Sequence, residues 1–418
     1  MANSNLTKTR PQESMTRTRR RFLQDGLAAA GILAAGPWLG ACGSSPSAPR
    51  PQSNLTNLGP LGAPDANGLR LPAGFTSRVL ARSNEVVEGT GYTWHSAPDG
   101  AAVFPAPDGG WYYTVNSEVP GTGGGASAIL FDADGNIQDA YSILSGTNFN
   151  CAGGPTPWKT WLSCEEDFAG YGAVYECDPS GKDSAVRREA MGLFTHEAVA
   201  VDPKRQQLLM TEDQPDGGFY RFTPNQYEDL SAGRLEIASV ADIDAVIAGD
   251  ISQVTWLPVP DPTASQEFTR RQVAASTNFL GGEGIWYQDG VAYFSTKFDN
   301  RIWSYQAADE TLCLLYDAAR DGGLLTGVDN VTIGLGGEVL VAEDGGDMEI
   351  VVLAPGSSSC ELVSVIPLIQ IIGQENSEVT GPVFDQSGTR LYFSSQRGTT
   401  GDFLNGGITY EVSGPFVV

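Results

Sequence analysis

The chain has 418 residues, and its 25 Lys and Arg against 50 Asp and Glu give a formal net charge of −25. A balance this acidic argues against nucleic acid as a partner and against a polybasic membrane-binding surface. The 51 glycines and 25 prolines are interspersed with aromatic and β-branched residues, a composition typical of many short strands and tight turns.

Residues 1–41 are expected to be an export signal. A basic start is followed by a Gly- and Ala-rich apolar run, and TRRRFL at 18–23 fits the twin-arginine pattern. LGAC at 39–42 fits a lipobox in which Cys42 becomes the lipidated N-terminus. The sequence therefore predicts a periplasmic or outer-surface lipoprotein, and an ordinary signal peptide is the alternative. A lipid on Cys42 would be the only membrane contact.

Residues 42–70 are rich in Ser, Pro, Gly and Asn without apolar periodicity, which predicts a flexible tether. Residues 71–418 are then one large all-β domain. Within it, a strand led by a turn ends in a polar cluster about six times, at intervals of about 45 to 55 residues. This period is typical of a β-propeller with about four strands per blade. We therefore expect six blades, with a small helical insertion between the third and fourth where 239–249 and 265–276 have helical patterns.

A second polar residue precedes most of these strands, at the start of an earlier short strand. Because the two inner strands of a blade are antiparallel, the start of the first and the end of the second lie at the same end. Both sets should therefore surround one mouth of the central channel and form an axial metal site. The candidate ligands are Glu118, Cys164, Glu165, Glu197, Asp213, Glu283, Asp329, Glu343 and Glu378. So many carboxylates at one axis favour calcium, which takes six to eight oxygen ligands.

Histidine and cysteine narrow the choice of metal. The two histidines, His95 and His196, are too few for a typical zinc hydrolase site. A thiolate from Cys164 among carboxylates would suit iron better than calcium. Disulfide pairing of the cysteines is the alternative, and the connectivity stays open: Cys313 could pair with Cys360, and Cys151 with Cys177.

Two basic residues, Lys297 and Arg397, occur where other repeats carry acids. A guanidinium there could hold a phosphate or carboxylate in two places. Each cation could instead balance the charge of a neighbouring carboxylate.

The segments NCAGGPTPWKTWLSCEED, FTHEAVAVDP, GGEGIWY and SEVTGPVFDQSGTRLYFSSQRG together resemble the PhoX-type alkaline phosphatases, as a short, twin-arginine-exported member. The resemblance implies a propeller with an axial cluster of ferric iron and calcium, and hydrolysis of phosphate monoesters. By motif position, Cys164 would be the thiolate ligand of iron. Metal-binding carboxylates would be Glu165, Glu197, Glu283, Glu343 and Glu378.

The expected mechanism is metal-ion catalysis on a small phosphoester, with Arg397 and Lys297 stabilising charge on the phosphoryl group. We expect a monomer. Two alternatives are a calcium-dependent lactonase-type propeller hydrolase and a non-catalytic, calcium-stabilised binding lipoprotein.

Overall fold

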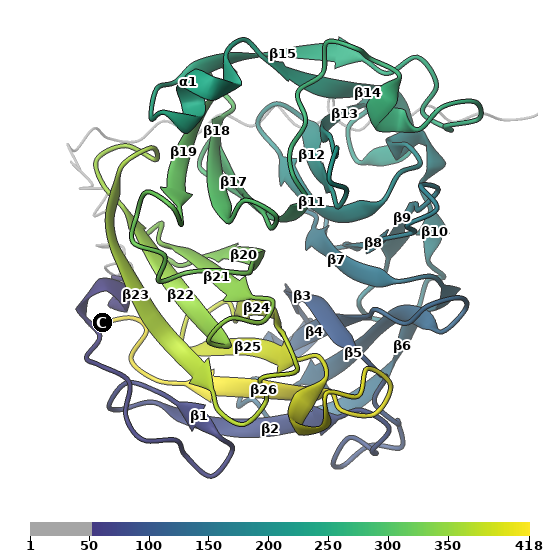
Figure 1. The fold of residues 1–418 in the computed structure, drawn as a ribbon. Coiled ribbons are helices and arrows are strands. Elements are labelled where there is room, and N and C mark those ends of the chain that lie inside the picture. Colours follow the sequence, from purple (N-terminus) through teal and green to yellow (C-terminus); the bar gives the residue numbers. More distant parts are fainter. Residues whose placement is uncertain (1–51) are drawn as a thin grey trace, which may run out of the picture. The chain divides into compact units, whose positions relative to one another are not determined.

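The computed structural model describes residues 52–418, which form an all-β, propeller-like fold with sheets grouped around a common axis (Figure 1). Helical structure is limited to short pieces: α1 (Ile243–Ile247), η1 (Leu55–Asn57), η2 (Pro107–Gly109), η3 (Glu189–Met191), η4 (Thr269–Arg271) and η5 (Gly398–Thr400). In this part of the chain, no helix has the length and apolar character needed to cross a bilayer.

Three of the sheets have four strands each. The first contains β3 (Pro98–Pro105), β4 (Trp111–Ser117), β5 (Gly124–Phe131) and β6 (Ile137–Thr147). The second contains β7 (Asn150–Pro155), β8 (Trp161–Glu165), β9 (Val174–Cys177) and β10 (Val186–Arg187). The third contains β24 (Val379–Phe384), β25 (Arg390–Ser395), β26 (Ile408–Ser413) and β2 (Thr76–Arg82).

The other two sheets are larger. A five-stranded sheet contains β20 (Val328–Ile333), β21 (Val339–Glu343), β22 (Glu349–Pro355), β23 (Leu362–Ile371) and β1 (Leu69–Arg70). A nine-stranded sheet contains β11 (His196–Asp202), β12 (Gln207–Glu212), β13 (Phe219–Gln226), β14 (Asp229–Val240), β15 (Ser252–Pro258), β19 (Thr311–Asp317), β18 (Arg301–Gln306), β17 (Val291–Thr296) and β16 (Gly282–Gln288). The structure thus has five sheets rather than six separate ones, because β15 pairs with both β14 and β19.

The expected helical insertion between the third and fourth repeats is mostly strand and loop. Its first candidate, 239–249, contains the end of β14 and the five-residue α1, whose Asp242 side chain accepts a hydrogen bond from the Ala245 amide. The second, 265–276, contains only η4.

The start and end of the chain close the ring of sheets. β2 pairs antiparallel with β26, so the last sheet combines strands from both ends of the domain. Residues 52–70, predicted to be part of a flexible tether, instead pack on the domain: Leu55 and Leu69 are buried, and β1 pairs with β23. The segment packs on the domain despite its loop-like composition, because two leucines are buried and the backbone of β1 forms hydrogen bonds with β23. Residues 42–51 and the expected signal at 1–41 lie outside the described residues.

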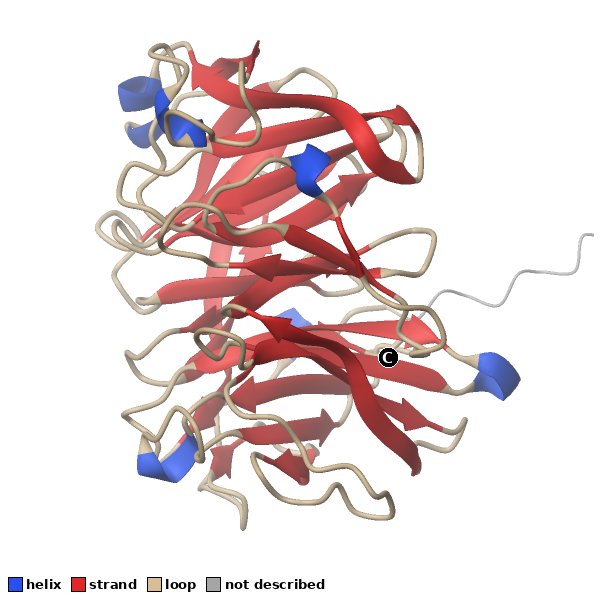
Figure 2. Ribbon diagram, turned by 90° about the vertical axis from the view of Figure 1, so that its right-hand side faces the viewer, coloured by secondary structure: helices blue, strands red, loops and turns tan. Residues whose placement is uncertain are grey.

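Six innermost strands surround the axis: β3, β7, β11, β16, β20 and β24. Each contacts the next in chain order, and β24 contacts β3 (Figure 1). Figure 2 shows from the side that loops connect the strands at both ends. Large side chains fill the space between sheets; for example, Tyr113 on β4 stacks on Tyr392 on β25 with ring centroids 4.7 Å apart.

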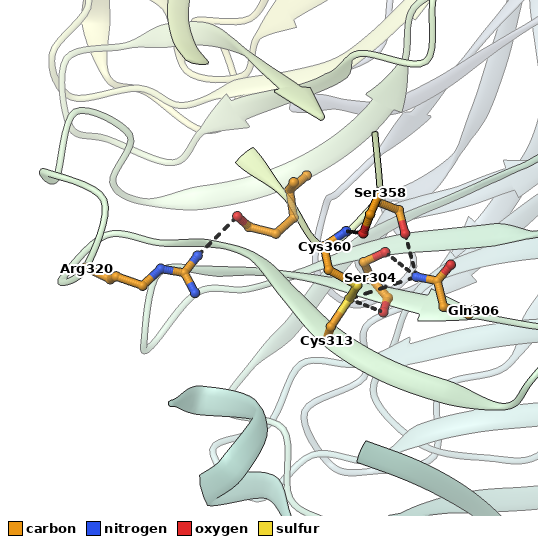
Figure 3. Close-up of a disulfide and its surroundings, with 8 residues drawn as sticks. Ser304, Gln306, Cys313, Arg320, Ser358 and Cys360 are labelled. Carbon is orange, nitrogen blue, oxygen red and sulfur yellow. Dashed lines mark hydrogen bonds between the residues drawn. A yellow bond between two sulfur atoms is a disulfide. The ribbon is translucent and has the colours of Figure 1, made fainter. Parts of the chain in front are cut away.

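One disulfide joins neighbouring repeats, between Cys313 on β19 and Cys360 in the turn after β22 (Figure 3). The pairing of Cys313 with Cys360, left open by the sequence, is thus formed. Cys151 and Cys177 do not pair, and both are free, buried thiols. A native disulfide typically adds about 2–4 kcal/mol to the free energy of unfolding.

Candidate metal centre at one end of the axis

The six innermost strands share a local irregularity that directs side chains toward the axis. Each has a register shift just after its first one or two paired residues. A β-bulge places two residues opposite one and redirects a side chain. In five of the six strands the first residue of the bulge can ligate a metal: Asp99, Cys151, Glu197, Glu283 and Asp329.

A second set of polar side chains follows the strand that pairs with each innermost strand. The residue directly after the first pairing partner is, in chain order, Glu118, Glu166, Asp213, Lys297, Asp344 and Gln396. Because each pair of strands is antiparallel, this set lies at the same end of the axis as the bulge residues. We call this end the mouth.

Small residues follow the bulge residues and let the innermost strands approach one another. A Cβ on Gly100 would lie 2.5 Å from the Cα of Ala152, and one on Gly284 would lie 2.7 Å from the Cα of Asn330. Neither position has room for a side chain. This close approach brings the acids of different sheets within reach of each other.

Ligand atoms at the mouth form three overlapping groups, in each of which they lie within 4.8 Å of one another. The groups are Asp99–Glu118–Cys151, Cys151–Glu166–Glu197 and Glu197–Glu283–Asp329. Asp213 adjoins Glu283, since the Nζ of Lys297 lies 2.5 Å from Asp213 Oδ2 and 2.6 Å from Glu283 Oε1. We define the axial cluster as Asp99, Glu118, Cys151, Glu166, Glu197, Asp213, Glu283, Asp329 and Glu378.

Several oxygens of the axial cluster are buried without a donor. Both carboxylate oxygens of Glu197, and Oδ1 of Asp99 and of Asp213, have no hydrogen-bond partner among the described residues. Unpaired buried carboxylate oxygens are costly, and such groups are normally paired or bound to metal ions. Hard oxygen donors with one thiol are also the donor set that calcium and iron accept. The residues present therefore fit a metal centre.

Burial and repulsion between like charges raise the pKa values of Asp99, Cys151, Glu197 and Glu283 in the axial cluster. Desolvation is the larger cause for Asp99 and Glu197, followed by the charges of Glu118 and Glu283 respectively. Burial raises the pKa of Glu118 to about 7. The pKa of the Cys151 thiol is raised by burial and then by Asp99. Without cations these groups favour their protonated forms, so bound cations would displace protons.

Two side chains supply positive charge at the mouth. Lys297 is held by Asp213 and Glu283, which raise its pKa against the effect of burial. Arg397 makes one ion pair, Nη2 to Glu378 Oε1 at 3.1 Å, and is 29% exposed. The neutral amide of Gln396 donates to Asp99 Oδ2 and Glu118 Oε2, both at 2.6 Å. Lys297 thus balances neighbouring carboxylates, whereas Arg397 keeps donors free.

The structure brings most of the sequence-predicted site residues together. Those at the mouth are Glu118, Glu197, Asp213, Glu283, Lys297, Asp329, Glu378 and Arg397. Cys164, Glu165 and Glu343 lie elsewhere.

Cys164 is fully buried in an apolar cluster with Leu162, Val174 and Phe194. Side chains on a strand alternate between faces, so Cys164 shares the face of Leu162 rather than pointing to the axis. The expectation that Cys164 is the thiol of the metal centre is therefore wrong in this structure: the thiol at the mouth belongs to Cys151.

Glu165 and Glu343 each end a second strand and accept backbone hydrogen bonds. Glu165 accepts from the amides of Asn148 and Ala173. Glu343 accepts from the amides of Thr326, Asp347 and Glu349, all at 3.1 Å. These carboxylates satisfy turn amides instead of pointing into the axial cluster.

The two histidines also stay outside the axial cluster. His95 Nδ1 lies 2.8 Å from Ser127 Oγ, and His196 stacks on Phe194 at 3.5 Å with Nε2 2.9 Å from the Gly192 carbonyl oxygen. Burial lowers the pKa of each to about 3, so both are neutral.

The sequence patterns did not single out Asp99, Cys151 or Glu166 as candidate metal ligands, although all three lie in the axial cluster. One signal was available: Asp99, Cys151, Glu197 and Glu283 are each followed directly by Gly or Ala. A ligand-type residue before a small one marks the bulge in four repeats.

Fold and site together define a β-propeller-like protein with a buried cluster of acidic side chains at one end of its axis that could hold metal ions. Residues 113–398 match the model of the alkaline phosphatase PhoX family. This match spans more than half of the chain, and the protein belongs to that family. No curated protein matches the sequence significantly.

Among solved structures, PhoX of Pseudomonas fluorescens in complex with vanadate, a transition-state analogue, is similar with a TM-score of 0.67 at 15% identity, covering 85% of this chain and 97% of that one. A Bacteroides thetaiotaomicron protein of unknown function has a TM-score of 0.49 at 11% identity, covering 85% and 84% of the two chains. A gluconolactonase of Xanthomonas campestris has a TM-score of 0.45 at 14% identity, covering 86% of this chain and 98% of that one. The last two are too distant to inform function.

Proposed function

We propose that this protein hydrolyses phosphate monoesters and that it needs metal ions in the axial cluster to do so. The observation that carries the proposal is the set of buried, donor-free carboxylate oxygens beside a partly exposed arginine. Membership of the alkaline phosphatase PhoX family supports the reaction class.

The metals we propose are calcium and ferric iron. Carboxylates suit calcium, and Cys151 would be the iron ligand because its thiol is the one near Glu166 and Glu197. Bound cations would polarise phosphoryl oxygens and lower the pKa of a bound water. Several cations would also reverse the negative field of the axial cluster, which otherwise repels a phosphate.

The chain's own cations have separate roles in this proposal. Arg397 would bind two phosphoryl oxygens with the guanidinium donors that Glu378 leaves free, and stabilise charge that develops there. Lys297 would hold Asp213 and Glu283 in place and keep their charge balanced. Gln396 would orient Asp99 and Glu118.

We further propose that the nine-stranded sheet is two blades sharing β15, which gives six repeats around the axis; the six innermost strands support this count. Export by the twin-arginine route, lipidation of Cys42, a periplasmic or outer-surface location and a monomeric state remain proposals from the sequence.

The test is p-nitrophenyl phosphate hydrolysis by protein loaded with calcium and iron, with and without a chelator. We expect the chelator to abolish activity and Arg397→Ala to lower kcat/KM by about 100-fold or more. Arg390→Ala is the matched control, because Arg390 lies over Trp111 and faces Asp385 and Glu411 away from the mouth. Activity that survives both chelation and Arg397→Ala would refute the proposal.

A further inference from the structure

In the described part of the chain, the largely exposed aromatic side chains lie at the mouth. Within residues 52–418, the largely exposed aromatic residues are Phe168 (54%), Tyr171 (49%) and Phe298 (55%). Phe168 and Tyr171 lie in the loop between β8 and β9 that begins with Glu166, and Phe298 directly follows Lys297. Exposed apolar residues scattered singly are normal, whereas exposed apolar side chains beside a polar site are candidates for contacts with a ligand bound there.

Phe298 is held as a rigid platform beside Lys297. Its amide donates to the Leu280 carbonyl at 3.2 Å, and the Lys297 amide donates to the Gly281 carbonyl at 2.8 Å. The ring lies over Gly281, where a Cβ would come within 2.7 Å of it. Lys297 Nζ is 5.7 Å from the ring centroid. The exposed ring therefore covers a fixed backbone next to a charged group of the site.

A second platform lies between Glu118 and Glu166. Phe149 has a φ of 46°, a strained conformation for a bulky residue. Its amide donates to the Val119 carbonyl, and its carbonyl accepts from the Glu166 amide at 2.8 Å. Backbone strain of this kind persists where surrounding structure enforces it, often at functional sites.

The strained Phe149 supports the exposed Phe168. The two rings meet edge to face, with centroids 5.8 Å apart and planes at 76°. A third ring, the half-buried Phe403, lies 5.9 Å from the guanidinium of Arg397. Apolar rings thus accompany the charged groups at three places on the mouth. We call Phe149, Phe168 and Phe298 the aromatic rim.

We propose that the aromatic rim binds the alcohol part of the phosphate ester, so that the protein favours monoesters of aromatic alcohols over those of small polar alcohols. This inference rests on the proposed function. A phosphoryl group beside Arg397 would leave its ester oxygen directed outward, past the rings. An aromatic alcohol gains about 0.5–1.5 kcal/mol from each ring it packs on, whereas a polyol gains little.

The position of the rings favours a small ligand over a macromolecular partner. Phe298 is adjacent to Lys297, and Phe168 is two residues from Glu166, so a protein or membrane covering them would also cover the mouth. An aromatic ester occupies both the rim and the site at once.

The first measurement is kcat/KM for 1-naphthyl phosphate and for glycerol 3-phosphate in the metal-loaded protein. We expect Phe298→Ala and Phe168→Ala each to lower the value for 1-naphthyl phosphate by about 3- to 10-fold, mainly through KM, and to change the value for glycerol 3-phosphate less than 2-fold. Phe298→Trp should retain the wild-type ratio. Comparing each variant with wild type cancels the different intrinsic reactivities of the two esters.

The matched control is Tyr227→Ala. Tyr227 and Trp158 form a similar edge-to-face pair, with centroids 5.5 Å apart at 84°, but they lie in turns outside the mouth. Tyr227→Ala should leave kcat/KM unchanged for both esters. A thermal unfolding scan confirms that each variant is folded.

The second measurement does not depend on turnover. Calorimetric Kd values for 1-naphthylmethylphosphonate and methylphosphonate should show a preference for the aromatic compound that Phe298→Ala reduces by the same 3- to 10-fold. If the variants lost kcat/KM equally for both esters, or if Phe298→Ala left the Kd ratio of the two phosphonates unchanged, the proposed role of the aromatic rim would be wrong. Wild-type protein that hydrolyses neither ester would instead refute the proposed function, and the phosphonate Kd ratio would still decide the rim.

Discussion

At the scale of single residues, two cysteines thirteen positions apart have opposite environments. Cys151 lies on a bulge and joins two of the ligand groups at the mouth, whereas Cys164 packs with Leu162 and Val174. Both thiols are buried and both have raised pKa values, first because of desolvation. Burial therefore does not distinguish them; only the direction of the side chain does.

Replacing each cysteine tests this assignment. Cys151→Ser should remove most of the iron, because a serine hydroxyl does not replace a thiolate for iron. Cys164→Ser should keep the metals but lower the free energy of unfolding by about 1–3 kcal/mol, since it buries a hydroxyl among apolar side chains. Elemental analysis and urea unfolding measure the two effects. Iron lost from Cys164→Ser and retained by Cys151→Ser would reverse the assignment.

At the scale of an element, the ends of the second strands repeat one arrangement. Glu165, Glu212 and Glu343 are the last residues of β8, β12 and β21, and each accepts backbone amide hydrogen bonds from the following turn. The next residue, Glu166, Asp213 or Asp344, then points toward the mouth. The first acid of each pair thus accepts hydrogen bonds from the turn, and the residue after it lies at the mouth.

This division of roles predicts different outcomes for two acids of the β20–β21 pair. Glu343→Ala should lower the free energy of unfolding by about 2 kcal/mol, because it leaves three amides without their charged acceptor, but should leave metal content unchanged. Asp329→Ala should lower metal content with a smaller loss of stability in the metal-free protein. If Glu343→Ala lost as much metal as Asp329→Ala, Glu343 would belong to the centre after all.

At the scale of the whole molecule, closure of the ring collects charge that is scattered along the chain. The axial cluster combines side chains from Asp99 to Glu378, and its carboxylates outnumber Lys297 and Arg397. The Cys313–Cys360 disulfide joins neighbouring repeats, and the β2–β26 pairing closes the ring by joining the two ends of the domain within one sheet. Folding therefore creates a repulsive centre that bound cations would relieve.

Stability of the metal-free protein should consequently fall as pH rises. A carboxyl whose pKa is raised in the folded state keeps its proton there while the unfolded chain has lost it, so the folded state binds more protons. For Glu118 the pKa rises from 4.5 to about 7, so the stability that its proton contributes is lost between these two pH values. Urea midpoints of chelator-treated protein should decline across this range, and calcium-loaded protein should show little decline.

Glu118→Gln is the control for this pH dependence, because it removes one titrating group and should make the decline shallower. Identical pH profiles for the calcium-loaded and metal-free proteins would contradict the role of cations in relieving the cluster.

The amino-acid sequence by itself determined the repeat, the all-β class and the family, because turn residues, strand composition and motif order are local properties. It also placed eight of the eleven predicted site residues at the mouth, since antiparallel pairing fixes which strand ends meet.

The tertiary structure alone decided which side chains face the axis. These are Cys151 rather than Cys164, and Glu166 rather than Glu165. A one-residue change of register at a β-bulge exchanges the two faces of a strand, and the bulge depends on how closely neighbouring strands pack. It also decided that β15 joins two repeats and that residues 52–70 pack on the domain, because both depend on contacts between segments far apart in the chain.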